Sequence, residues 1–475
     1  MAELHDLTAL EQWNELQRGA TSPTELVAHY LDRIDRLNPE LGAFVTVTRD
    51  AALARAAQVE TSVPRTAPLW GLPLGDKDLW LRAGVPAGFG SRLRTGFVPD
   101  TSDEIVETLD AAGSISLGKT ATPEFGLPSY TESLVAPPAR NPWDPSLGAG
   151  GSSGGAAVAV AAGLLPIAPG SDGGGSIRIP AAACGLVGLK PSRGRVPAGS
   201  GIDSLAGLSV AGPLARTVTD AALLLDGMIA RVHGRPDHHY ALRAPDENDG
   251  PYLGAAVHGE GRFQLGVMTT SAWDDAYEIS LAPEAITALD HAVVEFAALG
   301  HGIEQTALTP DPTYAPAFRT IWQVGAARIP AEGAQEELLE PLTRWLLRAG
   351  RAVSARELAD ALTALSAYER SLIRQLSSFD AVLTPAMAMT PRPVGWFDRE
   401  DGERNFAQQV QYTPFTSMVN VSGLPAITLP IDQPSAGVPM GVQLVGRPGG
   451  EATLLALGAQ LERRIGWAAR HPRVW

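Results

Sequence analysis

Short apolar runs that alternate with helical segments constrain the fold of this chain more than any other feature. From Leu69 onward, runs such as LWGLPLG, ISLGKT, LPIAPG and LVGLKP are bounded by Gly and Pro, which is typical of buried strands. Segments such as SDEIVETLDAAG and TVTDAALLLDGMIA alternate with them and have the apolar spacing of helices. Alternation of this kind predicts an α/β layer fold.

The order of these segments predicts one α/β domain over all 475 residues. Near the N-terminus, LVAHYLDRIDRL has helical spacing, and Ser22 can cap a helix with Glu25 three positions later. Strand-like runs return in FDAVLTPA, LPAITLPI and GVQLVG, so the tail is expected to rejoin the same sheet. The expected parts are N-terminal helices over 1–65, a core over 66–233, a loop and helical insert over 234–376, and the C-terminal part of the sheet over 377–475.

The bulk composition argues against several classes of partner. The net charge is −15 and no basic stretch offsets it, so nucleic acid and anionic membranes are not expected to bind. No run reaches the roughly 18 apolar residues that a membrane span needs, and Pro166 and Pro169 interrupt the best candidate. The acidic start MAELHDLTALEQWNEL is unlike a signal peptide, and the use of a single cysteine favours a reducing cytoplasm. The single cysteine, Cys184, excludes an internal disulfide, and its small apolar surroundings predict a packed structural thiol.

One motif matches the phosphate-binding loop of nucleotide-binding proteins. Gly113–Thr120, GSISLGKT, fits G-x-x-x-x-G-K-[ST] in every specified position. That loop needs a strand before it and a helix after it. Here a helical segment precedes it, Ile115 and Leu117 alternate like a strand, and Pro123 and Pro128 prevent a long helix afterwards. We therefore predict helix, turn and strand, and a nucleotide-binding protein is the disfavoured alternative.

A second motif, GGSSG at 150–154, matches the G-x-S-x-G nucleophile elbow. The elbow follows a buried strand, but NPWDPSLGA contains two prolines and is not expected to form one. It also needs a downstream histidine, whereas His471 lies four residues from the C-terminus and the His238-His239 pair lies in a polar loop. An α/β-hydrolase is therefore not expected.

A linked set of motifs is far more specific. GLPLGDKDL (71–79) and the small-residue run GAGGSSGG are followed by GSDGGGSIRIPAAACGLVGLKPSRGRVP (170–197), and together these resemble the amidase signature family of serine hydrolases. The resemblance continues through GKTATPEFG, RNPWDPS, GPLARTVTDAALLLD, FDAVLTPA and NVSGLPAITLPI, in the order usual for the family. It implies a mixed central β-sheet sandwiched by α-helices, with 66–233 as the signature core and 234–376 shaping the substrate pocket.

Carried over by position, the resemblance implies a triad in which Ser176 is the nucleophile, Ser152 the bridging serine and Lys77 the base. In the family the bridging serine follows a cis peptide bond, which here would be Gly151–Ser152. The chemistry is reasonable without the family, because a serine hydroxyl needs a base, and a lysine can serve only as the neutral amine.

Small residues around the nucleophile suit an oxyanion hole, because backbone amides without side chains can approach a substrate carbonyl. The expected donors are Gly173, Gly174, Gly175 and Ser176. The resemblance gives supporting roles to Ser153, Asp172 and Arg178.

One position departs from the family pattern, since Asp76 precedes Lys77 where a small or apolar residue is usual. Carboxylates close to the amine would raise its pKa and weaken it as a base. If the segment is extended, however, Asp76 and Asp78 point away from the face that carries Lys77.

The expected activity is hydrolysis of a carboxamide C–N bond through an acyl-enzyme, without metal or cofactor. Linear, aryl and cyclic amides are the expected substrates, and esters and carbamates (urethanes) present the same carbonyl. Likeness is greatest to bacterial amidases and the 6-aminohexanoate cyclic-dimer hydrolase branch. Expected pocket residues are Gly126, Leu127, Tyr130 and Thr131 from the segment 125–133, with the insert around Ile321 and Trp322.

An alternative within the family is the A-type subunit of a glutamine-dependent tRNA amidotransferase. The stretches usual in that branch are replaced here by PEFGLP and SVAGP, which disfavours it. A small-molecule substrate is the expected partner, for a monomer or a homodimer.

Overall fold

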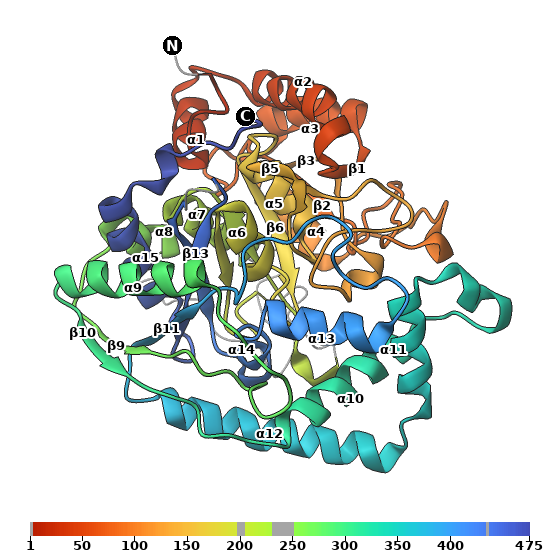
Figure 1. The fold of residues 1–475 in the computed structure, drawn as a ribbon. Coiled ribbons are helices and arrows are strands. Elements are labelled where there is room, and N and C mark those ends of the chain that lie inside the picture. Colours follow the sequence, from red (N-terminus) through yellow and green to blue (C-terminus); the bar gives the residue numbers. More distant parts are fainter. Residues whose placement is uncertain (1–2, 197–204, 230–250, 434–436) are drawn as a thin grey trace.

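A mixed eight-stranded sheet, in the order β10-β9-β11-β13-β12-β7-β8-β6, runs through the molecule (Figure 1). The computed structural model describes residues 3–196, 205–229, 251–433 and 437–475. The β10–β9 and β9–β11 pairs are parallel, and the remaining neighbours are antiparallel. The strands are β6 (Ile167–Asp172), β7 (Val187–Lys190), β8 (Val210–Ala215), β9 (Gln264–Val267), β10 (Gly302–Gln305), β11 (Ala381–Pro385), β12 (Ala426–Asp432) and β13 (Met440–Gly446).

A smaller sheet places Lys77 beside the large sheet. Its strands are β1 (Phe44–Val47), β2 (Pro73–Lys77) and β3 (Ile115–Thr120), with β3 in the middle. Strand β2 packs beside β6, so Lys77 at the end of β2 lies next to the strand that leads into the glycine-rich loop.

Several helices pack directly on the large sheet. Helices α7, α9 and α15 pack on β8, β11, β12 and β13, while α5 and α6 pack on each other and on β6 and β7. Their bounds are α5 (Gly154–Ala161), α6 (Arg178–Cys184), α7 (Val218–Met228), α8 (Tyr252–His258), α9 (Pro283–Ala298) and α15 (Glu451–Ile465). Every residue of α5 is buried, which is why the sequence there is restricted to Gly, Ala and Val.

An outer group of helices lies at the bottom of the view in Figure 1. Helix α10 packs on both α11 and α12, and α13 packs on α11. Their bounds are α10 (Tyr314–Ala327), α11 (Pro341–Ala352), α12 (Ala355–Leu376), α13 (Gly402–Tyr412) and α14 (Ser417–Ser422). In the described ranges, no helix is long and apolar enough to cross a membrane.

The N-terminal part consists of α1 (Ala9–Arg18), α2 (Pro23–Leu41) and α3 (Arg49–Ser62), and α4 (Glu104–Ala111) precedes β3. Ser22 and Glu25 form the predicted capping box at the start of α2. Strand β1 was not predicted, because this four-residue strand has no clean alternation and lies between two strongly helical segments.

Two further segments differ from the sequence-based expectations. Strands β9 and β10 come from the predicted insert 234–376 and extend the large sheet; both are short, and most of the edge strand β10 is exposed, so neither has a strong apolar signal. The stretch before the glycine turn, expected to lack a strand, forms a hairpin of β4 (Arg140–Asn141) and β5 (Asp144–Gly148). A partly exposed two-stranded hairpin tolerates proline better than a central strand does.

Candidate active site

The glycine–serine run forms a tight turn between β5 and α5. The Gly151–Ser152 peptide bond is cis, and Gly150 has a φ of 72°. A side chain at Gly151 would lie 2.6 Å from the backbone of Tyr130, and one at Gly154 would lie 2.3 Å from the Thr131 hydroxyl. The run is therefore a closely packed turn that places Ser152 rather than a linker.

Lys77 approaches this turn from the end of β2 and is fully buried. Its Nζ lies 2.8 Å from Ser152 Oγ and 3.0 Å from Ser171 Oγ, and it also donates to the Ser171 carbonyl at 3.3 Å. Burial lowers the pKa of Lys77 to about 7, against an opposing effect of the Asp172 charge. Near neutral pH a large share of the amine is therefore neutral, the form that accepts a proton.

The two aspartates that flank Lys77 face other partners. Asp76 accepts hydrogen bonds from Arg82 Nε at 2.6 Å and from Ser116 Oγ at 2.8 Å. Asp78 accepts from the Gly88 amide at 3.1 Å. Both carboxylates are thus engaged away from Lys77, as the extended segment predicts, and the pKa of the lysine falls instead of rising.

Asp172 organises the loop between β6 and α6. Its carboxylate accepts from the amides of Gly175 at 2.7 Å and Ile177 at 3.1 Å, and from Arg178 Nη2 at 2.9 Å and Nε at 3.0 Å. Although burial alone would raise it, the Arg178 charge and its hydrogen bonds hold the pKa of Asp172 well below its usual range. The loop is therefore braced by a buried ion pair that stays ionised.

Residues from the C-terminal part of the chain also bind Arg178. Arg178 donates to the Thr416 carbonyl at 3.0 Å, to Asn420 Oδ1 at 2.6 Å and to Gln443 Oε1 at 2.7 Å. Sequence reasoning did not select Asn420 or Gln443. Each is an amide side chain inside an otherwise apolar run. This pattern could have identified them, because a buried amide in a strand or helix requires a polar partner.

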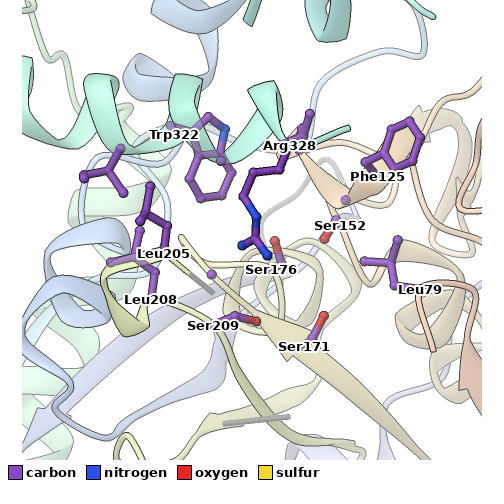
Figure 2. A pocket seen from close by; sticks show the side chains of 15 residues that line it. Leu79, Phe125, Ser152, Ser171, Ser176, Leu205, Leu208, Ser209, Trp322 and Arg328 are labelled. Carbon is purple, nitrogen blue, oxygen red and sulfur yellow. The ribbon is translucent and has the colours of Figure 1, made fainter. Parts of the chain in front are cut away.

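Ser176 lies at the end of this loop and is buried, with 8% of its surface exposed. Its carbonyl accepts a hydrogen bond from the amide of Ser153 at 3.1 Å, which ties the glycine-rich loop to the turn that carries Ser152. Ser152 and Ser176 line the same cavity, and Figure 2 shows their hydroxyls there together with that of Ser171.

The four expected oxyanion donors are not equivalent. The Gly175 amide is already bonded to Asp172. Within the described part of the chain, the amides of Gly173, Gly174 and Ser176 donate to no protein group. Side chains at Gly173 and Gly174 would point toward the Trp322 ring at 3.7 Å, so these two glycines face the indole across the cavity.

The cavity beside Ser176 has a volume of about 250 Å³ and mostly apolar walls. Of the predicted pocket residues, Gly126, Leu127, Ile321 and Trp322 line it. The full set is Leu79, Phe125, Gly126, Leu127, Ser152, Ser171, Gly173, Ser176, Leu205, Leu208, Ser209, Ile321, Trp322, Gly325 and Arg328. A smaller cavity of about 60 Å³ reaches Ser176 between Gly174, Trp273, Phe318 and Phe406.

Tyr130 and Thr131 lie elsewhere, a correction to the expected pocket wall. Thr131 Oγ1 donates to the Gly150 carbonyl at 2.9 Å, and the Tyr130 hydroxyl accepts from Asn405 Nδ2 at 2.8 Å. Both residues pack behind the glycine turn, and neither lines the two cavities. The segment 125–133 thus contributes its first residues to the pocket and its later ones to support of the turn.

The competing motifs do not form sites of their own in the described residues. GSISLGKT forms the end of a helix–turn–strand unit, and Lys119 is buried in β3 with its Nζ bonded to the Trp80 carbonyl. Burial raises the pKa of Cys184, which donates to the Ala149 carbonyl at 3.7 Å and behaves as a structural thiol. His471 stacks against Trp475, while His238 and His239 lie outside the described residues.

Potential metal ligands gather at a different place. Among the described residues, Glu3, His5 and His29 have ligand atoms within 4.8 Å of one another. His5 Nδ1 and His29 Nε2 lie 3.1 Å apart and share a hydrogen bond. These residues belong to the N-terminal segment and α2, which do not line the cavity at Ser176.

The chain is similar along nearly its whole length to known proteins of one family. Residues 25–455 match the family model described as Amidase. AmiB2 of Mycobacterium tuberculosis is 38% identical over 480 residues, with 98% of each chain covered. A glutamyl-tRNA(Gln) amidotransferase A-type subunit of Geobacter sp. is 33% identical over 497 residues, with 98% of each covered. The structure of 6-aminohexanoate cyclic dimer hydrolase complexed with substrate matches with a TM-score of 0.90 at 31% identity, covering 100% of both chains.

Proposed function

The chain belongs to the amidase family, and from that premise we propose that it cleaves carboxamides through an acyl-enzyme on Ser176. The observation that carries the proposal is the 2.8 Å contact between Lys77 Nζ and Ser152 Oγ, made by an amine whose pKa is about 7. A buried amine of that pKa, bonded to a serine that shares a cavity with Ser176, is a base within reach of a relay.

In the proposed first step, Ser176 Oγ attacks the substrate carbonyl carbon. Its proton passes to Ser152 Oγ, and the proton of Ser152 passes to the neutral Lys77 amine. The amides of Gly173, Gly174 and Ser176 would donate to the oxyanion that forms. One such donor contributes roughly 2.7–4 kcal/mol of transition-state stabilisation in well-studied cases.

In the second step the C–N bond breaks, and Ser152 returns a proton to the leaving amine while Lys77 resupplies Ser152. Water then attacks the acyl-enzyme, and its proton passes through Ser152 to the neutral Lys77 amine. When the C–O bond to Ser176 breaks, the proton returns by the same route to Ser176 Oγ, which releases the carboxylic acid and restores Ser176. No step of this route uses a metal or a cofactor. Asp172 positions the loop without taking up a proton, since it is held ionised by Arg178.

The cavity favours a small, largely apolar amide as the substrate. Its volume of about 250 Å³ suits a small molecule, and Leu79, Phe125 and Trp322 supply apolar contact area. Linear, aryl and cyclic amides fit this description. Esters and carbamates are further candidates, because they present the same carbonyl to the same donors.

Active-site labelling tests the nucleophile directly. We expect a fluorophosphonate to label the protein once, with peptide mapping placing the adduct on Ser176. The Ser176→Ala variant should resist labelling, while Ser209→Ala, which changes another serine of the same cavity, should still be labelled. An adduct on any other residue would contradict the proposed mechanism.

A substrate panel tests the reaction class. Short amides, anilides, cyclic amides, esters, carbamates and glutamine should be compared by kcat/KM, and we expect the amides and anilides with apolar arms to be hydrolysed faster than glutamine. Glutaminase activity that rises on addition of the other amidotransferase components would instead favour the role of the Geobacter relative.

A further inference from the structure

One face of α10 forms a continuous wall of the cavity at Ser176. Ile321, Gly325 and Arg328 all line the cavity, and their spacing of four and then three residues places them on the same side of the helix. Trp322 flanks this face and covers Gly173 and Gly174. This face of the helix therefore presents an apolar side chain, a glycine and a cation to the cavity within two turns.

Gly325 creates the gap. It lies inside α10, where glycine is less favourable than alanine by about 1 kcal/mol. A Cβ placed at Gly325 would meet nothing within 4 Å, so close packing within the protein does not require the glycine. Its effect is to leave open volume in the wall beside the nucleophile.

Arg328 supplies the cation at the C-terminal end of the same helix. Among the described residues that line the cavity, it is the single charged side chain. Figure 2 shows its side chain reaching from the end of α10 toward Ser176.

We infer that Gly325 and Arg328 form a subsite for amides that carry a carboxylate on a short apolar arm, an inference that rests on the proposed amidase function. The arm would pass through the gap at Gly325, and its carboxylate would pair with the guanidinium. A guanidinium has five N–H donors, so Arg328 can keep contacts within the protein and still bind a carboxylate through two of them.

Matched substrate pairs test the charge preference. The 4-nitroanilides of glutaric and pentanoic acid have acyl arms of equal length and differ in a terminal carboxylate. N-pentanoyl-4-aminobenzoate and N-pentanoylaniline place the same difference on the amine side. We expect kcat/KM to be about 10- to 100-fold higher for the carboxylate member of at least one pair, the range typical of charged hydrogen bonds. Equal values in both pairs would overturn the inference.

Variants of Arg328 assign the preference to this residue. Arg328→Gln should abolish it and Arg328→Lys should retain part of it, both measured as the ratio of kcat/KM within each pair, so that a general change in activity cancels. Arg356→Gln, which removes an exposed arginine of α12, controls for the change in net charge and should leave the preference intact. A preference that survives in Arg328→Gln would overturn the subsite.

Binding separates this inference from the proposed mechanism. In the Ser176→Ala variant, calorimetry should show tighter binding of the glutaric than of the pentanoic anilide, and Arg328→Gln in that background should remove the difference. If the wild type hydrolyses none of these compounds but the binding difference is present, the subsite stands and the proposed function fails. If the two Kd values are equal and the wild type hydrolyses these compounds, the proposed function stands and the subsite fails.

Filling the gap tests the path of the arm. Gly325→Leu should reduce kcat/KM for the pentanoic anilide about tenfold more than for 4-nitroacetanilide, because the added side chain would occupy the space of the longer arm. Gly325→Ala should have a smaller effect in the same direction and should raise the melting temperature, as alanine favours the helix. Equal loss with both substrates would contradict the path.

Discussion

Two buried lysines, Lys77 on β2 and Lys190 on β7, have different surroundings although burial lowers the pKa of both to about 7. Lys77 Nζ faces the hydroxyls of Ser152 and Ser171. Lys190 Nζ donates to the Pro191 carbonyl at 2.8 Å and lines neither described cavity. A lowered pKa is therefore a consequence of burial, and the hydroxyl that the amine faces decides whether it can act as a base.

The ion pair between them affects both lysines. Asp172 opposes the fall in pKa at Lys77 and at Lys190, whereas the Arg178 charge adds to it only at Lys190. Lys190 thus belongs to the charged brace of the loop, while Lys77 belongs to the hydroxyl cluster on the other side of Asp172. Variants of these residues and the pH profile test this distinction.

The largest expected effect is the contrast between Lys77→Met and Lys190→Met. Loss of a general base typically costs about 10²–10⁴-fold, so kcat/KM for an anilide should fall about a thousandfold or more in Lys77→Met. Lys190→Met should lose less than about tenfold, because it removes a cation that touches no reacting group. Circular dichroism checks that both variants fold, and full activity of Lys77→Met near pH 8 would refute the assignment of the base.

The next effect concerns Asp172, and Asp172→Asn should act in two opposite ways. The plateau of kcat should fall by about 10- to 100-fold, because the Gly175 amide loses its charged acceptor. The variant should also be less stable, since a buried ion pair that loses one partner costs roughly 3–5 kcal/mol. The acidic limb of the pH profile should move to lower pH, because the charge that raises the pKa of Lys77 is gone. A limb that moves to higher pH would contradict the electrostatic link.

A smaller effect is expected from pH itself. Catalysis needs the neutral amine, so activity is lost as pH falls through the Lys77 pKa of about 7 and is retained above it. Measured as kcat/KM against pH, the loss should approach tenfold for each pH unit below the limb. Lys190→Met should keep the same limb; if the limb moved instead, Lys190 would be the titrating group.

The smallest effect is expected at Asp76. Asp76→Asn should change kcat/KM by less than about threefold, because the carboxylate bonds to Arg82 and Ser116 and not to Lys77. Arg82 keeps its bonds to Asp110 at 2.7 and 3.0 Å. A large shift of the pH limb in this variant would show that the adjacent aspartate does tune the base.

Local sequence patterns predicted much of the fold. The alternation of apolar runs and helical segments predicted the α/β class, and the capping box predicted the start of α2. Strands β1, β9 and β10 are not evident from the sequence, because each has four residues and is stabilised by pairing with a strand remote in sequence. The β4–β5 hairpin is not evident because proline disfavours a partly exposed hairpin less than it disfavours a central strand.

The residues available for chemistry are visible in the sequence: a serine inside a run of glycines, a second serine after three glycines, and a lysine far upstream. Which of them meet depends on the fold, because Lys77 and Ser152 are 75 positions apart and their contact requires β2 to pack beside β6. Tertiary packing also turned Tyr130 and Thr131 toward the glycine turn, brought Asn420 and Gln443 to Arg178, and aimed Arg328 at the cavity. The physical reason is burial: desolvation and the neighbours met in the core set the pKa of Lys77, and neither can be read from adjacent residues.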